Sequence, residues 1–120
     1  MSCISPSFKF PSPSGLSKEV YEERVTRIAR NCAQFAREQG VKLYVEMSTA
    51  QVYGSGGKPA KEDAKTSPKY DFEQCKLRAE EEVGKVAGLN HIILRAGMVY
   101  GPGDRLGYIT SQLVIASIYR

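Results

Sequence analysis

The sequence has little of what several protein classes require. Among its 120 residues there is no tryptophan, one histidine (His91) and an odd count of three cysteines. Cys3, Cys32 and Cys75 share no metal-ligand spacing with one another or with His91, so we expect reduced thiols and neither a disulfide framework nor a metal site. This cysteine usage predicts an intracellular, cytoplasmic protein.

Long apolar runs are also missing. No segment approaches the roughly 20 apolar residues that cross a membrane, and residues 1–16 carry serine and proline but no apolar core of a signal peptide. The net charge is +4, yet the lysines between 58 and 65 alternate with acidic residues, so there is no basic stripe. We therefore predict a poorly ordered leader over 1–16, no membrane span and no nucleic-acid partner.

Residues 17–120 show alternating helical and strand patterns. Apolar side chains with a spacing of three and four residues indicate helices, and short runs of branched and aromatic residues indicate buried strands. Glycines follow the first two helices, where a left-handed residue commonly ends a helix. The predicted elements are a helix over 17–39 ended by Gly40, a strand over 41–47, a helix from Ser67-Pro68 to about Ala87 ended by Gly88, a strand over 91–94, and a helix over 109–119.

This order predicts an α/β fold with a doubly wound parallel sheet. Strands that alternate with helices pair in parallel through right-handed crossovers. Two strands alone do not make a stable sheet, and at least one apolar strand would have an unpaired edge. We interpret the chain as the second half of a larger domain, or as a protein whose exposed sheet edge is covered by a protein partner.

Three sequence blocks carry the chemistry. They are Ser48-Thr49-Ala50-Gln51-Val52-Tyr53-Gly54 after the first strand, Lys76 in the second helix, and Arg95 to Asp104 (RAGMVYGPGD) after the second strand. Together they resemble the extended short-chain dehydrogenase/reductase family, also called NAD-dependent epimerases/dehydratases, over residues 17–116. The resemblance implies a partial, Rossmann-type NAD(P)-binding domain over 17–120. The LRxxxVYGPGD stretch is more similar to the 3β-hydroxysteroid dehydrogenase branch.

The resemblance implies two catalytic positions. Thr49, four residues before the VYG tyrosine, matches the residue that hydrogen-bonds the reacting oxygen. Lys76 matches the lysine that holds the nicotinamide ribose and lowers the pKa of a catalytic tyrosine. The alternatives are that Thr49 only closes a strand and that Lys76 is only a solvated charge.

Further positions follow from the third block. Ala96 and Gly97 match the segment whose backbone meets the nicotinamide of NAD or NADP. Gln51 and Met98 are the substrate-side positions, and Met98 stands where many nucleotide-sugar enzymes have asparagine. Met98, together with Ala50-Gln51 in place of the Asp-Glu pair of sugar dehydratases, disfavours a nucleotide sugar. The resemblance to the 3β-hydroxysteroid dehydrogenase branch implies instead a small apolar alcohol or ketone, sterol-like in character.

The sequence departs from the family at the proton carrier. The family's YxxxK motif places tyrosine four residues before the lysine, where this sequence has Phe72, which offers no phenolic proton. Tyr70 lies about 200° from Phe72 around a regular helix and would point away from Lys76 unless the helix start is shifted. Cys75, just before the lysine, is expected to be a small buried side chain and not a nucleophile.

The sequence also has no convincing dinucleotide loop. Gly101-x-Gly103-x-x-x-Gly107 belongs to the late block and precedes no acidic ribose ligand, and Gly54-Ser55-Gly56-Gly57-Lys58 lacks the spacing of a phosphate loop. We expect this chain alone to bind NAD(P) weakly. The family implies an NAD(P)-dependent epimerase/dehydratase or oxidoreductase, truncated and weakly active or inactive; the alternative is a non-catalytic interaction or structural module. Whether the chain is an enzyme stays open.

Overall fold

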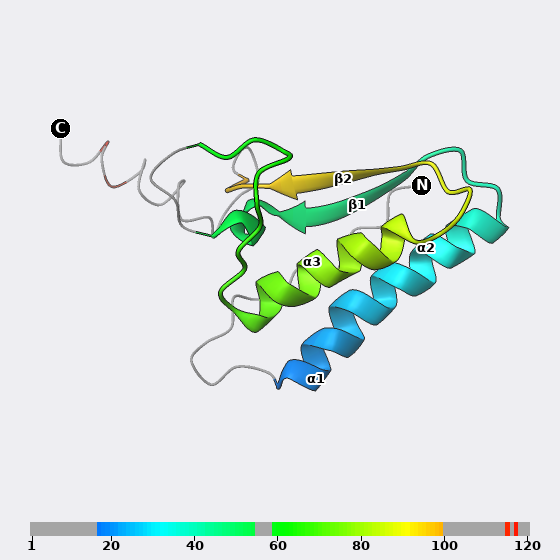
Figure 1. The fold of residues 1–120 in the computed structure, drawn as a ribbon, viewed down its shortest axis with the longest axis horizontal. Coiled ribbons are helices and arrows are strands. Elements are labelled where there is room, and N and C mark those ends of the chain that lie inside the picture. Colours follow the sequence, from blue (N-terminus) through cyan, green and yellow to red (C-terminus); the bar gives the residue numbers. More distant parts are fainter. Residues whose placement is uncertain (1–16, 55–58, 100–114, 116, 118–120) are drawn as a thin grey trace.

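The computed structural model describes residues 17–54, 59–99, 115 and 117. A long helix precedes a parallel β-α-β unit, and the helices pack on one side of the two strands (Figure 1). The predicted order of helix, strand, helix and strand is confirmed. The elements are α1 (Lys18–Tyr21), the π-helical segment η1 (Glu22–Arg27), α2 (Ile28–Glu38), β1 (Tyr44–Thr49), the 3₁₀ helix η2 (Ala50–Tyr53), α3 (Asp71–Gly84) and β2 (His91–Ala96).

Some sequence predictions fall outside the described residues. These are the leader over 1–16, the glycine-rich segment at 55–58 and the turn at 101–103. The helix predicted over 109–119 also lies outside, apart from Ile115 and Ser117, which are helical. In the described part of the chain, no helix is long and apolar enough to cross a membrane.

The first helix ends where the sequence predicts. Gly40 has a φ of 64°, and its N–H donates to the Arg37 carbonyl at 3.1 Å. The N–H of Val41 donates to the Ala36 carbonyl at 2.9 Å. These two bonds complete a glycine-dependent helix end and turn the chain toward the sheet.

Both strands differ in extent from the prediction. The strand predicted over 41–47 instead spans Tyr44–Thr49, because the Val41 N–H is used to end the preceding helix. The other strand continues two residues beyond 94 and ends at Ala96. The strands pair in parallel, with Tyr44 opposite His91 and Thr49 opposite Ala96. Thr49 and Ala96 therefore lie together at the carboxyl end of the sheet.

The predicted start of the second helix is wrong. Ser67 does not cap α3, because its N–H donates to the Val52 carbonyl at 2.8 Å and fixes this segment on η2. The helix begins at Asp71 after an extended Tyr70 (φ −107°, ψ 155°). The Glu73 carboxylate accepts hydrogen bonds from the backbone N–H of Lys69 at 2.6 Å and of Tyr70 at 3.1 Å. This first-turn carboxylate satisfies N–H groups at the helix start.

The end of α3 also differs from the prediction. The helix ends at Gly84, not near Ala87. The next residues form turns, and Gly88 takes the left-handed conformation with a φ of 73°. Gly88 is thus part of the turn into β2.

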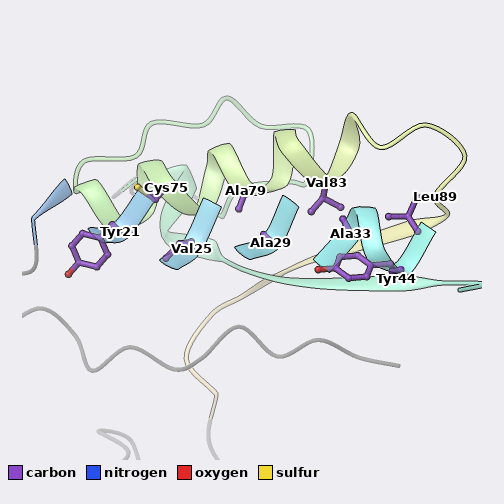
Figure 2. Close-up of a cluster of buried hydrophobic side chains, with 10 residues drawn as sticks. Tyr21, Val25, Ala29, Ala33, Tyr44, Cys75, Ala79, Val83 and Leu89 are labelled. Atoms are coloured by element: carbon purple, nitrogen blue, oxygen red, sulfur yellow. The ribbon is translucent and has the colours of Figure 1, made fainter. Parts of the chain in front are cut away.

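The core lies between α3 and the α1–η1–α2 helix, with Tyr44 contributed by β1 (Figure 2). Its centre contains small side chains, and Ala33 and Ala79 are completely buried. Small residues let the two helices approach closely. The buried cluster consists of Tyr21, Val25, Ala29, Ala33, Ala36, Tyr44, Cys75, Ala79, Val83 and Leu89.

The sheet has one covered face and one open face. On β1, Tyr44, Glu46 and Ser48 alternate toward the helices and are buried. On β2, Ile92 and Leu94 point the other way, and each is 45% exposed. Parallel sheets are usually covered on both faces. The open face (Val45, Met47, Ile92 and Leu94) has no covering layer within the part of the chain that the structure describes.

Candidate active site

Thr49 occupies the last position of β1 and the start of η2. Its Oγ1 accepts a hydrogen bond from the Gln51 N–H at 3.2 Å, so the hydroxyl caps the short helix. Capping uses an acceptor lone pair and leaves the hydroxyl proton available for another partner. Gln51 and Met98, the predicted substrate-side residues, are both exposed.

Lys76 lies inside the protein. The residue is 6% exposed, and its Nζ donates to the Met47 carbonyl of β1 at 2.6 Å. Glu46 Oε1 lies 3.9 Å from the same ammonium. Burial lowers the pKa of Lys76, while the nearby carboxylates of Glu46 and Glu80 act in the opposite direction. Lys76 is therefore a buried, paired cation in this structure, and the solvated-charge alternative is wrong.

Glu46 is the counter-charge that sequence reasoning missed. Its carboxylate accepts a hydrogen bond from the Tyr44 hydroxyl at 3.0 Å and is buried on the covered face of the sheet. Burial raises the pKa of Glu46, and the neighbouring Glu80 adds to this, while Tyr44 and Lys76 oppose it. The alternation of β1 could have signalled this residue, because it places Glu46 on the same face as Tyr44 and Ser48.

Phe72 packs against the first helix. Its ring meets the Tyr21 ring edge-to-face, with centroids 6.1 Å apart, and it contacts the buried cluster. Spacings of three and four residues place Phe72, Cys75 and Ala79 on one stripe facing the first helix. Phe72 and Lys76 are four residues apart on α3, and their contacts differ: Phe72 meets Tyr21 of the first helix, whereas Lys76 Nζ donates to the Met47 carbonyl of β1.

Tyr70 and Cys75 do not supply an obvious replacement for the missing phenol. Tyr70 precedes the helix and is 69% exposed, so the helical-angle argument does not apply to it. Cys75 is fully buried as predicted, and burial together with Glu22 raises the pKa of its thiol to about 11. A thiol with so high a pKa is a poor nucleophile.

A second polar cluster was not predicted. The Glu80 network comprises Ser48, Tyr53, Glu80 and Arg95. Glu80 accepts hydrogen bonds from the Ser48 hydroxyl and from Arg95, whose Nε lies 3.1 Å and Nη2 2.6 Å from Oε2. Arg95 Nη1 also donates to the Tyr53 hydroxyl at 2.6 Å. Glu80 raises the pKa of Arg95, which stays a cation.

Three members of the network, Tyr53, Glu80 and Arg95, line an open pocket of about 730 Å³ at the carboxyl end of the strands. Ligands commonly bind at this end of a parallel sheet. The pocket is bounded by Ala50, Tyr53, Gly54, Ala60, Glu62, Glu80, Ile93, Leu94 and Arg95. Ala50, which follows Thr49, connects it to the predicted site, but neither Thr49 nor Lys76 lines it.

The residues fit only part of a dinucleotide. Ala96 ends β2 opposite Thr49, and a Cβ built on Gly97 would meet no atom within 4 Å, so there is open space at this position. The ammonium of Lys76 is already engaged by the Met47 carbonyl and Glu46. Within 17–54 and 59–99, no glycine-rich turn leads from a strand into a long helix as a pyrophosphate requires.

Parallel strands joined through α3, with Thr49 and Ala96 together at their carboxyl ends, are the arrangement of part of a Rossmann-type α/β fold. The chain belongs to the NAD dependent epimerase/dehydratase family, whose family model matches residues 12–120. The predicted family and the partial Rossmann-type fold are thus confirmed. NAD is the cofactor of this family.

Known relatives are much longer than this chain. A UDP-glucose 4-epimerase of Vibrio cholerae is 28% identical over 103 residues, which cover 81% of this chain and 31% of the relative. The chain therefore spans about a third of that protein.

Two solved structures share the fold. A UDP-glucuronic acid 4-epimerase from Bacillus cereus, determined in complex with NAD, has a TM-score of 0.62 at 24% identity and covers 73% of this chain and 30% of its own. A dTDP-4-dehydrorhamnose reductase from Clostridium acetobutylicum has a TM-score of 0.65 at 23% identity, with 84% and 36% covered.

Proposed function

We propose that this chain forms the second half of an NAD(P)-dependent epimerase/dehydratase or oxidoreductase domain and that, by itself, it is not an effective catalyst. The packing of Phe72 carries this proposal. The family's proton carrier is a tyrosine beside the lysine, but Phe72 lies against Tyr21 in the helix interface. General acid–base groups typically contribute about 10²- to 10⁴-fold to a rate.

Thr49 and Lys76 are the proposed catalytic residues. Thr49 would donate its hydroxyl to a substrate carbonyl or alcohol oxygen, and its position opposite Ala96 at the carboxyl end of β1 supports this role. Lys76 would have to leave the Met47 carbonyl to reach a ribose, and its neighbour Glu46 would then lose its cation. When bound, NAD or NADP would supply the hydride acceptor or donor, with Ala96 and Gly97 next to the nicotinamide.

The substrate proposal is a small apolar alcohol or ketone. Met98 at the predicted substrate side is 61% exposed and offers a thioether but no amide to a sugar hydroxyl. The relatives named above act on nucleotide sugars according to their names, so the two substrate classes should be compared directly in any assay. A cytoplasmic location is part of the same proposal.

Substituting Phe72→Tyr should not restore hydride transfer. The new hydroxyl would lie beside Tyr21 between the helices, the Lys76 ammonium would stay bound to the Met47 carbonyl, and cofactor binding would remain weak. The measurement is the appearance of reduced nicotinamide with NAD⁺ or NADP⁺ and a panel of secondary alcohols and UDP-sugars, with folding checked by circular dichroism. Tyrosine-dependent formation of reduced nicotinamide would contradict the proposal.

An interaction module is the second candidate function, and the open face of the sheet favours it. Four apolar side chains lie on this face without a covering layer among the described residues. We propose that the partner is the first half of an NAD(P)-binding domain, because relatives of this chain are about three times as long. That half would supply both the missing helix layer and the glycine-rich loop.

Without that partner, an exposed apolar face should make copies of the chain associate with one another, and charge on the face should reduce this self-association. Ile92→Lys combined with Leu94→Lys is expected to shift sedimentation toward the monomer while changing the unfolding free energy by less than about 1 kcal/mol, because both side chains are already exposed. The matched control places lysine at buried Val83 and should unfold the chain. If the double variant associates as strongly as the unsubstituted chain, or fails to fold, Ile92 and Leu94 do not lie on an uncovered face of the sheet.

A further inference from the structure

The Glu80 network contacts the chain on both sides of the predicted catalytic threonine. We propose that Glu80 and Arg95 are positioning residues, which hold the turn over residues 49–53 in a fixed place relative to helix α3. The inference rests on the proposed function only in assigning Thr49 to the active site. The contacts themselves do not depend on that assignment.

Helix α3 holds the end of β1 at two successive residues. Lys76 and Glu80 are four residues apart and so project from neighbouring turns of one helix face. Lys76 Nζ binds the Met47 carbonyl at 2.6 Å, and the Glu80 carboxylate accepts from the Ser48 hydroxyl. Thr49 follows immediately. The position of its backbone is thus set by the same helix that carries Lys76.

Arg95 holds the other end of the turn. Its Nη1 donates to the Tyr53 hydroxyl at 2.6 Å and to the Glu62 carbonyl at 3.2 Å. The guanidinium carbon also lies 4.9 Å from the centre of the Tyr53 ring. Tyr53 is the last residue of η2. Ser48 and Tyr53 therefore flank Thr49, and both connect to Glu80, one directly and one through Arg95.

The geometry depends on a guanidinium in particular. Arg95 presents Nε and Nη2 to the Glu80 carboxylate while Nη1 reaches Tyr53. A planar fork can make these contacts together, whereas a lysine ammonium is a single point of charge. Glu80 is 5% exposed, so loss of its partner leaves a carboxylate with little access to water.

Amide hydrogen exchange of the full chain tests this role. The reporters are the Gln51 N–H, which is bonded to Thr49 Oγ1, and the Ser67 N–H, which is bonded to the Val52 carbonyl. In Arg95→Lys we expect both amides to exchange at least about tenfold faster, because hydrogen bonds to charged groups are lost locally. Amides in the centre of α2 should change less than about twofold.

Companion variants separate positioning from general stability. Tyr53→Phe removes only the hydroxyl that Arg95 binds and should speed exchange at Gln51 and shift the Thr49 methyl resonance. Glu81→Gln, a neutralised exposed neighbour of Glu80, should leave both signals unchanged. Equal acceleration throughout α2, α3 and the turn, or unchanged exchange at Gln51 and Ser67 in both Arg95→Lys and Tyr53→Phe, would overturn the proposal. None of these measurements needs a cofactor, so their outcome is independent of the cofactor binding that tests the proposed function.

Discussion

Replacing Lys76 with methionine is expected to destabilise the chain by about 3 kcal/mol, since removing one member of a buried charge pair leaves the other uncompensated. The residue left behind is Glu46, which is 3% exposed and would keep only its hydrogen bond from Tyr44. The Met47 carbonyl would also lose its donor. Urea unfolding followed by circular dichroism measures the change.

Two further variants isolate the cause. Lys76→Met combined with Glu46→Gln should be more stable than Lys76→Met alone, because the amide retains the contact with Tyr44 and carries no charge. Lys85→Met is the matched control, since Lys85 pairs with Glu82 on the surface and is expected to contribute less than about 0.5 kcal/mol. If Lys76→Met and Lys85→Met have equal effects, Lys76 is not a buried pairing residue.

The pairing of Lys76 with Glu46 also predicts how the stability of the Lys76→Met variant depends on pH. The pKa of Glu46 is raised in the folded protein, so the folded state binds this proton more tightly than the unfolded state does. When folding raises the pKa of a carboxyl group, the stability that its protonated form contributes is fully present below the unfolded pKa. This contribution is lost as the pH rises through the folded pKa. Without Lys76 the pKa of Glu46 rises further. The loss of unfolding free energy in Lys76→Met, relative to the unsubstituted chain, should therefore be smaller at about pH 4.5 than at about pH 8. A larger loss in acid would contradict this account.

The order of elements could be predicted because periodicity and glycine stops are local signals. Gly40 ends the first helix through its own backbone conformation, and apolar runs mark both strands. The start of α3 could not be predicted in this way. Ser67 has the composition of a helix cap, but its N–H is used by Val52, so the helix begins four residues later with Glu73 satisfying its first N–H groups.

The candidate site was predictable only as separate positions. Thr49 and Ala96 follow from family blocks, and the strand register places them opposite each other. The side of α3 on which Phe72 packs depends on its contact with Tyr21, a residue 51 positions earlier in the numbering. Glu46 and the Glu80 network likewise depend on pairings between distant elements, which single-sequence patterns do not reveal.

Weak cofactor binding is the second large effect that we expect. In dinucleotide-binding domains the pyrophosphate contacts backbone N–H groups at a glycine-rich turn and a helix N-terminus. The sequence has no such turn in the required context, and Lys76, the proposed ribose contact, is engaged by β1. Ala96 and Gly97, the proposed nicotinamide contacts, would meet only one end of the cofactor. A thousandfold loss of affinity corresponds to about 4 kcal/mol of binding free energy.

Calorimetric titration of the purified 120-residue chain with NAD⁺, NADH, NADP⁺ and NADPH tests the central claim most directly. The Vibrio cholerae relative serves as the full-length comparison, and Gly97→Leu as the variant that closes the open position beside Ala96. If the chain is half of the domain, it should bind each nucleotide no tighter than millimolar. A low-micromolar dissociation constant that Gly97→Leu abolishes would show that this chain forms a complete cofactor site and would contradict the account.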